Sequence, residues 1–366
     1  MYKWFQVKNY RCFGDLKITR LQRVNLVAGK NNAGKSSLLE ALFMHCGGPN
    51  PLLALQISGM RGMEKVRIEF GATRETPWDS LFRDFDASRP IELLGETEQE
   101  GPRMVRVELV TQAQRVARFG ATVSGGTTQA QPTVLEVPVS ADVFRSLRFW
   151  GMGPDGEETK CDLVAVPGAE PHFEPTPPAP AFPGHLIGAR GRASTEVDGQ
   201  MFSQLGKEGL ERVLVEPLSV LEPRLTGLRL FDHHGQTVIH GDIGLSRSIP
   251  LPFIGEGMAR LASLLLRVWA AGGGVVLVDE IENGFHHSVL GQVWAAIGKV
   301  ARGSKTQVFA TTHSWECIVA AQQAFSEGEE YDFCLHRLDR IDGQIQDVTY
   351  DRETLDAAIE TGLEVR

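Results

Sequence analysis

The chain has 366 residues, 42% of them hydrophobic and 23% charged, which is the composition of an ordinary soluble protein. Its net charge of −9 does not support strong non-specific nucleic-acid binding, although the total charge leaves room for a local basic patch. Five scattered cysteines without Cys-x-x-Cys spacing favour reduced thiols in the cytoplasm over a disulfide frame or a zinc site. We expect no secretory signal at the first residues and no membrane span, because Arg267 and three glycines interrupt the most apolar stretch, 261–278.

Short strands are predicted over residues 3–28, with a turn at 9–14. The last strand runs into residues 29–37, GKNNAGKSS, which have the pattern G-x-x-x-x-G-K-[ST]. Backbone N–H groups of such a loop cradle phosphate oxygens, and the helix that follows adds its positive N-terminal end. We predict that Lys35 reaches the β- and γ-phosphates and that Ser36 binds Mg²⁺. A chance match is the alternative, but the apolar strand before the loop and the amphipathic run after it favour phosphate binding.

Three segments of alternating polarity follow, at 64–71, 105–110 and 134–139, and each is predicted to be a strand. Alternation leaves one face of a strand in water, which favours an antiparallel sheet beside the parallel core. Seven prolines between 167 and 183 indicate an extended connector. We therefore expect a first lobe, residues 1–183, with an antiparallel β insertion over about 95–183.

Residues 203–221 are helical in pattern, and Pro223 is expected to end that helix. Gly255 and Gly257 precede a second helical run that begins at Ala259. Two glycines at a helix entry can form an anion-binding nest or can simply turn the chain, and the sequence leaves both interpretations open. The two helices are expected to build a smaller helical lobe over residues 184–274.

The apolar residues 275–278 end in two carboxylates, Asp279 and Glu280, and fit a central parallel strand buried on both faces. Asp279 suits Mg²⁺ or one of its waters, and Glu280 can orient or deprotonate an attacking water. A second buried strand, 306–312, ends at His313, which can hydrogen-bond a γ-phosphate there. The alternatives are an acidic pair that merely ends a strand and a structural histidine. Residues 275–366 are expected to complete the core and to close with a strand pair and a final helix.

The order of these motifs resembles that of ABC-type ATPases. Residues 5–13 and 29–37 are similar to RecF and structural-maintenance-of-chromosomes (SMC) proteins, and residues 279–286 and 311–314 to the ATPase domain of the overcoming-lysogenisation-defect (OLD) family. The resemblance covers most of the chain except about 95–185. It implies an α/β fold of the P-loop, ABC-ATPase type, with a mainly parallel central sheet, an antiparallel β subdomain and a helical lobe that carries the signature motif.

The resemblance also implies the roles of individual residues. It places ATP on the phosphate loop and the signature motif (Gly29, Asn32, Gly34, Lys35, Ser36, Ser37, Gly255, Glu256 and Gly257), Mg²⁺ on Ser36 and Asp279, and catalysis on Glu280 as base and His313 as γ-phosphate switch. It implies a homodimer that closes head-to-tail on two ATP molecules, with Asn283 and His286 in its contact loop. The signature departs from the transporter pattern because it lacks Ser-Gly-Gly. The family also has a glutamine near the metal. Four residues of this sequence are possible candidates, and none is assigned: Gln56, Gln99, Gln200 and Gln204.

From these features we expect a Mg²⁺-dependent ATPase that dimerises on ATP and couples hydrolysis to control of a separate effector protein, and the resemblance alone suggests anti-phage defence in bacteria. A slowly hydrolysing ATP-gated scaffold and a nucleic-acid-associated repair ATPase of the RecF type are the alternatives. A transport ATPase is disfavoured by the signature and by the lack of a membrane segment. About 50 residues follow His313, which is too few for the nuclease domain of OLD proteins. The arginines at 190 and 192 are expected to lie in solvent, and the adjacent histidine pairs are not expected to bind a transition metal.

Overall fold

The computed structural model describes residues 1–62, 78–98, 101–112, 144–164, 172–189, 195–233, 236–328 and 330–365. Two of the predicted strands, 64–71 and 134–139, lie outside these residues, as do the arginines at 190 and 192.

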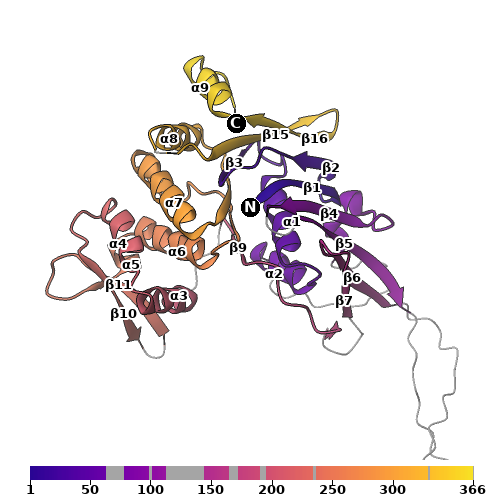
Figure 1. Ribbon diagram of the computed structural model, residues 1–366, viewed down its shortest axis with the longest axis horizontal. Coiled ribbons are helices and arrows are strands. Elements are labelled where there is room, and N and C mark those ends of the chain that lie inside the picture. Colours follow the sequence, from indigo (N-terminus) through magenta and orange to yellow (C-terminus); the bar gives the residue numbers. More distant parts are fainter. Residues whose placement is uncertain are drawn as a thin grey trace, which may run out of the picture.

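A six-stranded sheet forms the centre of the molecule (Figure 1). Its strands, in spatial order, are β16 (Gln344–Tyr350), β15 (Phe333–Ile341), β3 (Val24–Ala28), β14 (Gln307–Thr311), β13 (Val275–Val278) and β9 (Gly184–Ile187). All neighbours pair in parallel except β16, which is antiparallel to β15. Every residue of β3, β13 and β14 is buried, as expected for continuous apolar strands covered on both faces. The prediction of a mainly parallel central sheet is confirmed.

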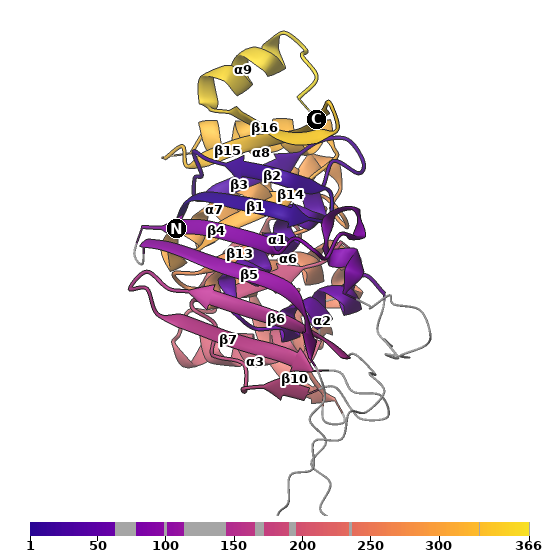
Figure 2. The same ribbon diagram turned by 90° about the vertical axis from the view of Figure 1, so that its right-hand side faces the viewer.

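A second sheet of seven antiparallel strands lies beside the first, and Figure 2 shows most of its strands side by side. Its order is β2 (Phe13–Ile18), β1 (Tyr2–Tyr10), β4 (Ile91–Thr97), β5 (Gly101–Gln112), β6 (Phe144–Met152), β7 (Glu158–Val164) and β8 (His172–Glu174). The antiparallel β subdomain is confirmed, and it also takes in the two strands at the start of the chain. Buried and less buried residues alternate along β4, which leaves one face of this sheet packed and the other wet.

Helix α1 (Lys35–Cys46) is packed between the two sheets. Leu38 and Leu42 share one apolar cluster with Phe309 of the central sheet and Val107 of the antiparallel sheet. Three helices cover the opposite face of the central sheet: α6 (Glu256–Ala270), α7 (Leu290–Ser304) and α8 (Trp315–Ser326). Helix α1 is therefore packed against other elements on both sides, and it begins near the carboxyl end of β3.

A lobe of helices and a small sheet lies beside α6. The sequence predicts one helix over 203–221, and this prediction is wrong, because Gly209, with a positive φ of 69°, turns the chain between two helices. The three-stranded sheet of this lobe was not predicted. The elements are α3 (Thr195–Lys207), α4 (Arg212–Ser219), β10 (Gly227–His233), β11 (Gln236–Asp242), β12 (Ile249–Pro250) and α5 (Leu251–Ile254).

The remaining elements are short or lie at the end of the chain. The closing strand pair is β15 and β16, and the final helix is α9 (Arg352–Glu360), as predicted. Within the part of the chain that the structure describes, no helix combines the length and apolar character needed to cross a bilayer. Four further elements are α2 (Leu52–Met60) and the 3₁₀ turns η1 (Asp79–Leu81), η2 (Arg83–Phe85) and η3 (His287–Val289).

Candidate nucleotide site

The phosphate loop connects β3 to α1 and needs glycine at two positions. Gly29 has a φ of 143°, and a Cβ there would lie 2.7 Å from the carbonyl oxygen of Leu338. Gly34, with a φ of 95°, caps α1, and its Cβ would lie 2.7 Å from the Sγ atom of Cys12. The loop therefore follows a path closed to larger residues, and it presents the free N–H groups at the start of α1.

The other predicted loop residues are Asn32, Lys35, Ser36 and Ser37. Asn32 is exposed, has a φ of 63° and accepts a hydrogen bond from Arg340 on its carbonyl oxygen. Lys35 and Ser36 begin α1 and are half-buried, whereas Ser37 is buried.

The side chain of Lys35 curls back over the loop. Its Nζ atom donates hydrogen bonds to the carbonyl oxygens of Gly29 at 2.7 Å and Lys30 at 3.2 Å. Burial lowers the pKa of Lys35, while three carboxylates from the far half of the chain act in the opposite direction: Asp279, Glu280 and Glu282. The fold thus places Lys35 in the field of the predicted acidic residues, which are more than 240 positions away in sequence.

Ser36 and Asp279 form the oxygen-rich part of the site. The Ser36 hydroxyl donates to Oδ1 of Asp279 at 3.0 Å, so α1 and β13 meet here. The Thr311 hydroxyl at the end of β14 donates to the same oxygen at 2.6 Å. Hydroxyl and carboxylate oxygens are the ligands that Mg²⁺ prefers, and Ser36 and Asp279 therefore fit a magnesium ion at the phosphate loop.

Glu280 directly follows Asp279 and makes hydrogen bonds through its N–H, its carbonyl oxygen and its carboxylate. Its N–H donates to the Thr311 hydroxyl at 2.8 Å, and its Oε2 accepts from Asn283 Nδ2 at 2.7 Å. Its carbonyl oxygen accepts from Arg260 Nη2 at 3.1 Å and from Asn283 N–H at 3.1 Å. Its φ of 48° is left-handed, which is uncommon for a residue other than glycine and occurs often at functional sites. Glu280 is thus held in a specific and strained backbone conformation.

His313 lies just after β14 and contacts a third acidic residue, Glu282. The His313 N–H donates to Glu282 Oε1 at 3.0 Å, and the ring Nδ1 lies 3.2 Å from the same oxygen. The His313 side chain is 55% exposed, whereas that of Glu282 is only 11% exposed. Glu282 therefore orients a histidine that presents its ring to the solvent side of the site.

The signature residues begin α6 and lie against the loop after the acids. Gly255 caps α6, Glu256 is exposed, and a Cβ on Gly257 would lie 3.0 Å from the carbonyl oxygen of Gly284. A cavity of about 200 Å³ between them is lined by both glycines and by His286. The structure thus joins the signature to the loop at 280–286, on which Asn283 and His286 also lie.

Sequence patterns missed three residues that organise the site: Thr311, Glu282 and Arg260. Each acts through a contact between distant elements, so no local motif marks it. The only signal was position, since Thr311 ends a buried strand and Glu282 lies two residues after Glu280, the predicted base.

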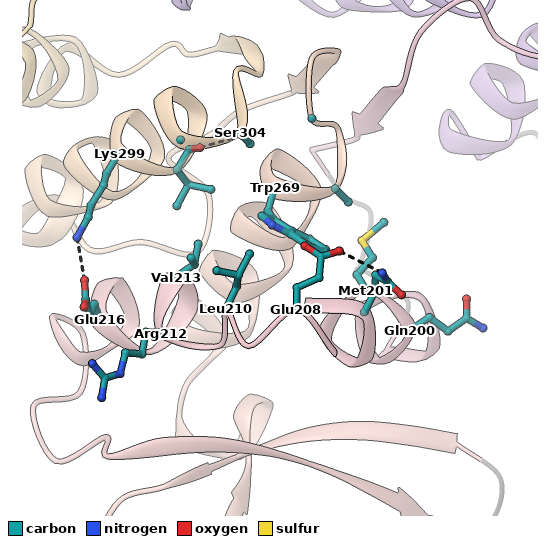
Figure 3. A pocket seen from close by; sticks show the side chains of 15 residues that line it. Gln200, Met201, Glu208, Leu210, Arg212, Val213, Glu216, Trp269, Lys299 and Ser304 are labelled. Atoms are coloured by element: carbon teal, nitrogen blue, oxygen red, sulfur yellow. Dashed lines mark hydrogen bonds and ion pairs between the residues drawn. The ribbon is translucent and has the colours of Figure 1, made fainter. Parts of the chain in front are cut away.

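A groove of about 960 Å³ lies between α3, α4 and the ends of α6 and α7 (Figure 3). Gln200 and Gln204 line it, and Gln204 donates to Glu208 at 3.1 Å. None of the predicted nucleotide or metal residues contributes to the groove. Gln200 and Gln204 are therefore poor candidates for the glutamine near the metal. Gln99 lies outside the described residues.

Two families of ATPase-type domains match parts of this chain. The family described as "AAA domain, putative AbiEii toxin, Type IV TA system" matches residues 166–318, and the family "AAA ATPase domain" matches residues 1–46. The Smc head in a crystal structure with the C-winged helix domain of ScpA superposes with a TM-score of 0.50, at 13% identity, over 98% of this chain and 99% of that chain. The fold is that of an ABC-type P-loop ATPase.

Two curated relatives point the same way. An "ATP/GTP phosphatase" of Helicobacter pylori is 22% identical, and the match covers 88% of each chain. The "DNA double-strand break repair Rad50 ATPase" of Archaeoglobus fulgidus is 47% identical over 49 residues, which are 13% of this chain and 6% of that protein. Together the comparisons support an ATPase of the AAA, SMC and Rad50 type. The narrower placement in the OLD family stays a prediction.

Proposed function

We propose that the protein is a Mg²⁺-dependent ATP hydrolase that dimerises on ATP and uses hydrolysis to control a partner protein in the cytoplasm. The observation that carries the proposal is the meeting of α1 and β13, where Ser36 lies 3.0 Å from Asp279 and Lys35 lies in the field of Glu280. A phosphate-binding loop, a metal-binding pair and a base in one place are the parts that phosphoryl transfer to water requires.

In the proposed reaction, water attacks the γ-phosphorus, a new P–O bond forms, and the bond to the β-phosphate oxygen breaks. Lys35 and the N–H groups of the loop bind the β- and γ-phosphates and stabilise their negative charge. A Mg²⁺ ion held by Ser36 and Asp279 would neutralise further charge on the phosphates. Glu280 orients the attacking water and accepts its proton, and His313 donates a hydrogen bond to the γ-phosphate.

The dimer and the partner extend the same proposal. Gly255, Glu256 and Gly257 lie at the start of α6, where free N–H groups suit the γ-phosphate bound by a second copy. The related Smc head is seen bound to a domain of another protein, which supports a separate effector here. The narrower idea of a role in anti-phage defence in bacteria rests on the resemblance to the OLD family.

A slowly hydrolysing scaffold is the second candidate, and one contact favours it. The Glu280 carboxylate accepts a hydrogen bond from Asn283 at 2.7 Å, which ties the base down. If this bond persists with ATP bound, turnover will be slow and the closed dimer will be the working state.

The test compares phosphate release and molecular mass for the wild type, Lys35→Ala and Glu280→Gln, with Glu353→Gln on α9 as a matched control. We expect Lys35→Ala to lose ATP binding. Glu280→Gln should bind ATP, form a dimer and turn over at least 100-fold more slowly, because a general base contributes about 10²–10⁴ in rate. Wild-type turnover in Glu280→Gln would refute the catalytic assignment. Slow turnover in the wild type, with dimerisation intact, would favour the scaffold.

A further inference from the structure

Arg260 links the signature helix to the catalytic base. It lies in the first turns of α6, three residues after Gly257, and is only partly exposed. Its Nη2 atom donates to the backbone carbonyl oxygen of Glu280 at 3.1 Å. The contact joins two elements that the proposed function uses separately, since α6 carries the signature and Glu280 activates water.

The backbone of Glu280 needs such an anchor. A left-handed φ of 48° is unfavourable for glutamate and persists only when the surroundings enforce it. Thr311 holds the N–H side of the residue, and the carbonyl side is held by Arg260 from α6 and by the N–H of Asn283 from the same loop. Without the guanidinium, the Glu280 carbonyl oxygen keeps the N–H of Asn283 at 3.1 Å but loses its tie to α6. The peptide that follows Glu280 is then held from its own loop alone, and the carboxylate is positioned less firmly.

The helix and the loop are packed too closely to move independently. A Cβ on Gly284 would lie 3.2 Å from Cδ of Arg260, and a Cβ on Gly257 would lie 3.0 Å from the carbonyl oxygen of Gly284. Burial lowers the pKa of Arg260, and three carboxylates act in the opposite direction: Glu282, Glu256 and Glu280. The guanidinium therefore lies close to acidic residues of both the helix and the loop.

We infer that Arg260 is a positioning residue that fixes the active posture of Glu280 and transmits the position of α6 to it. This inference rests on the proposed function. Its consequence is that a second copy that engages Gly255 and Gly257 acts on hydrolysis in the first copy through one guanidinium.

The test measures steady-state ATP hydrolysis and thermal unfolding of Arg260→Ala and of Arg267→Ala. Arg267 is the matched control, because it lies on the same helix but pairs with Asp198 of α3 at 2.5 Å. Arg260→Ala should lower kcat by about 10–100-fold at unchanged KM and ATP affinity, since small misplacement of a catalytic group has effects of this size. Arg267→Ala should lower the melting temperature and leave kcat of the folded protein near the wild-type value. If Arg260→Ala does not fold, Arg260→Lys keeps a charged donor and should show a smaller loss of kcat.

A double-mutant cycle separates positioning from a general structural effect. If Arg260 acts through Glu280, Arg260→Ala will leave the residual rate of Glu280→Gln unchanged. An equal fold-loss in both backgrounds, or wild-type kcat in Arg260→Ala, would overturn the inference. The proposed function fails separately, because it requires only that Glu280→Gln itself loses turnover.

Discussion

At the scale of single residues, the site depends on Thr311 as much as on the motif residues. Its hydroxyl donates to Asp279 at 2.6 Å and accepts from the N–H of Glu280 at 2.8 Å, so it sets both acids at once. It is fully buried at the end of β14. Under the proposed function, Thr311 is an outer partner of Asp279, the carboxylate proposed to bind Mg²⁺.

Thr311→Val keeps the shape of the side chain and removes both hydrogen bonds. We expect the Mg²⁺ concentration for half-maximal hydrolysis to rise roughly 10-fold or more, because outer partners of metal ligands have effects of this size. Mg²⁺ titrations of phosphate release provide the measurement. Thr312→Val is the control: Thr312 is equally buried but accepts from Ser314 instead, so its loss should leave the Mg²⁺ dependence unchanged. Identical Mg²⁺ curves for Thr311→Val and the wild type would contradict this role.

A buried histidine outside the site predicts how stability depends on pH. His336 of β15 is fully buried, with Nδ1 at 3.1 Å from Asp347 of β16. Burial alone lowers the pKa of His336, but hydrogen bonds to Asp347 and Cys334 outweigh it and raise the pKa to about 9. Because the folded pKa lies above the unfolded value, the stabilisation is complete below about pH 6.5 and is lost as the pH rises through about 9.

Urea unfolding at pH 6, 8 and 10 checks this prediction. Between pH 6 and pH 10, deprotonation of His336 should lower the free energy of unfolding of the wild type by up to about 3 kcal/mol. His336→Gln should be less stable at pH 6 and should lack this part of the pH dependence. If the free energy of unfolding changes with pH by the same amount in the two proteins, His336 is neutral in the folded state.

Among single residues, the motifs predicted Lys35, Ser36, Asp279 and Glu280, and the structure gathers all four. These residues were predictable because the chemistry of a phosphate loop needs fixed residue types at fixed spacing. Arg260 and Glu282 were not predictable, because their roles come from contacts that form only when distant elements meet.

At the scale of elements, the three glycines at 272–274 show how a sequence break becomes a packing requirement. They interrupt the most apolar stretch of the sequence, and in the structure they join α6 to β13. Gly274 N–H donates to the Ala271 carbonyl oxygen, and a Cβ on Gly274 would lie 2.0 Å from the carbonyl oxygen of Pro183. That carbonyl oxygen accepts from Val275 N–H, so the backbone at the start of β9 and β13 is too close for a side chain.

Gly274→Ala should therefore lower the free energy of unfolding by about 2–4 kcal/mol, because backbone atoms have to move apart. Gly272→Ala is the matched control, since the nearest atom to its Cβ would be 3.6 Å away. It should change stability by less than about 1 kcal/mol. Urea unfolding of both variants decides the matter, and similar losses for the two would show that crowding at Gly274 is unimportant.

Long, strongly patterned elements were predictable, whereas short ones were not. The buried strands β3, β13 and β14 have continuous apolar sequences that only a covered parallel sheet accommodates. The break between α3 and α4 depends on one glycine in a left-handed conformation, and β12 has only two residues. Neither feature produces periodicity that can be read from one sequence.

At the scale of the whole molecule, the fold pairs a strand from the first 30 residues with strands from the last 60 residues in the middle of one sheet. β3 pairs in parallel with both β14 and β15, so the phosphate loop lies beside segments from positions above 300. The adjacency of motifs was expected from the ABC-type resemblance. The division into lobes 1–183, 184–274 and 275–366 stays a prediction, and the structure adds that β9, at the start of the second segment, belongs to the central sheet.

The central claim is that Lys35 and Glu280 act on one bound triphosphate. A crystal structure of Glu280→Gln with ATP and Mg²⁺ tests it most directly, because this variant should bind ATP without consuming it. We predict that the γ-phosphate lies between the Lys35 ammonium and residue 280, with the metal on Ser36 and Asp279. ATP bound elsewhere on the chain, or a phosphate chain that contacts Lys35 while residue 280 points away from it across solvent, would show that the two residues do not act together.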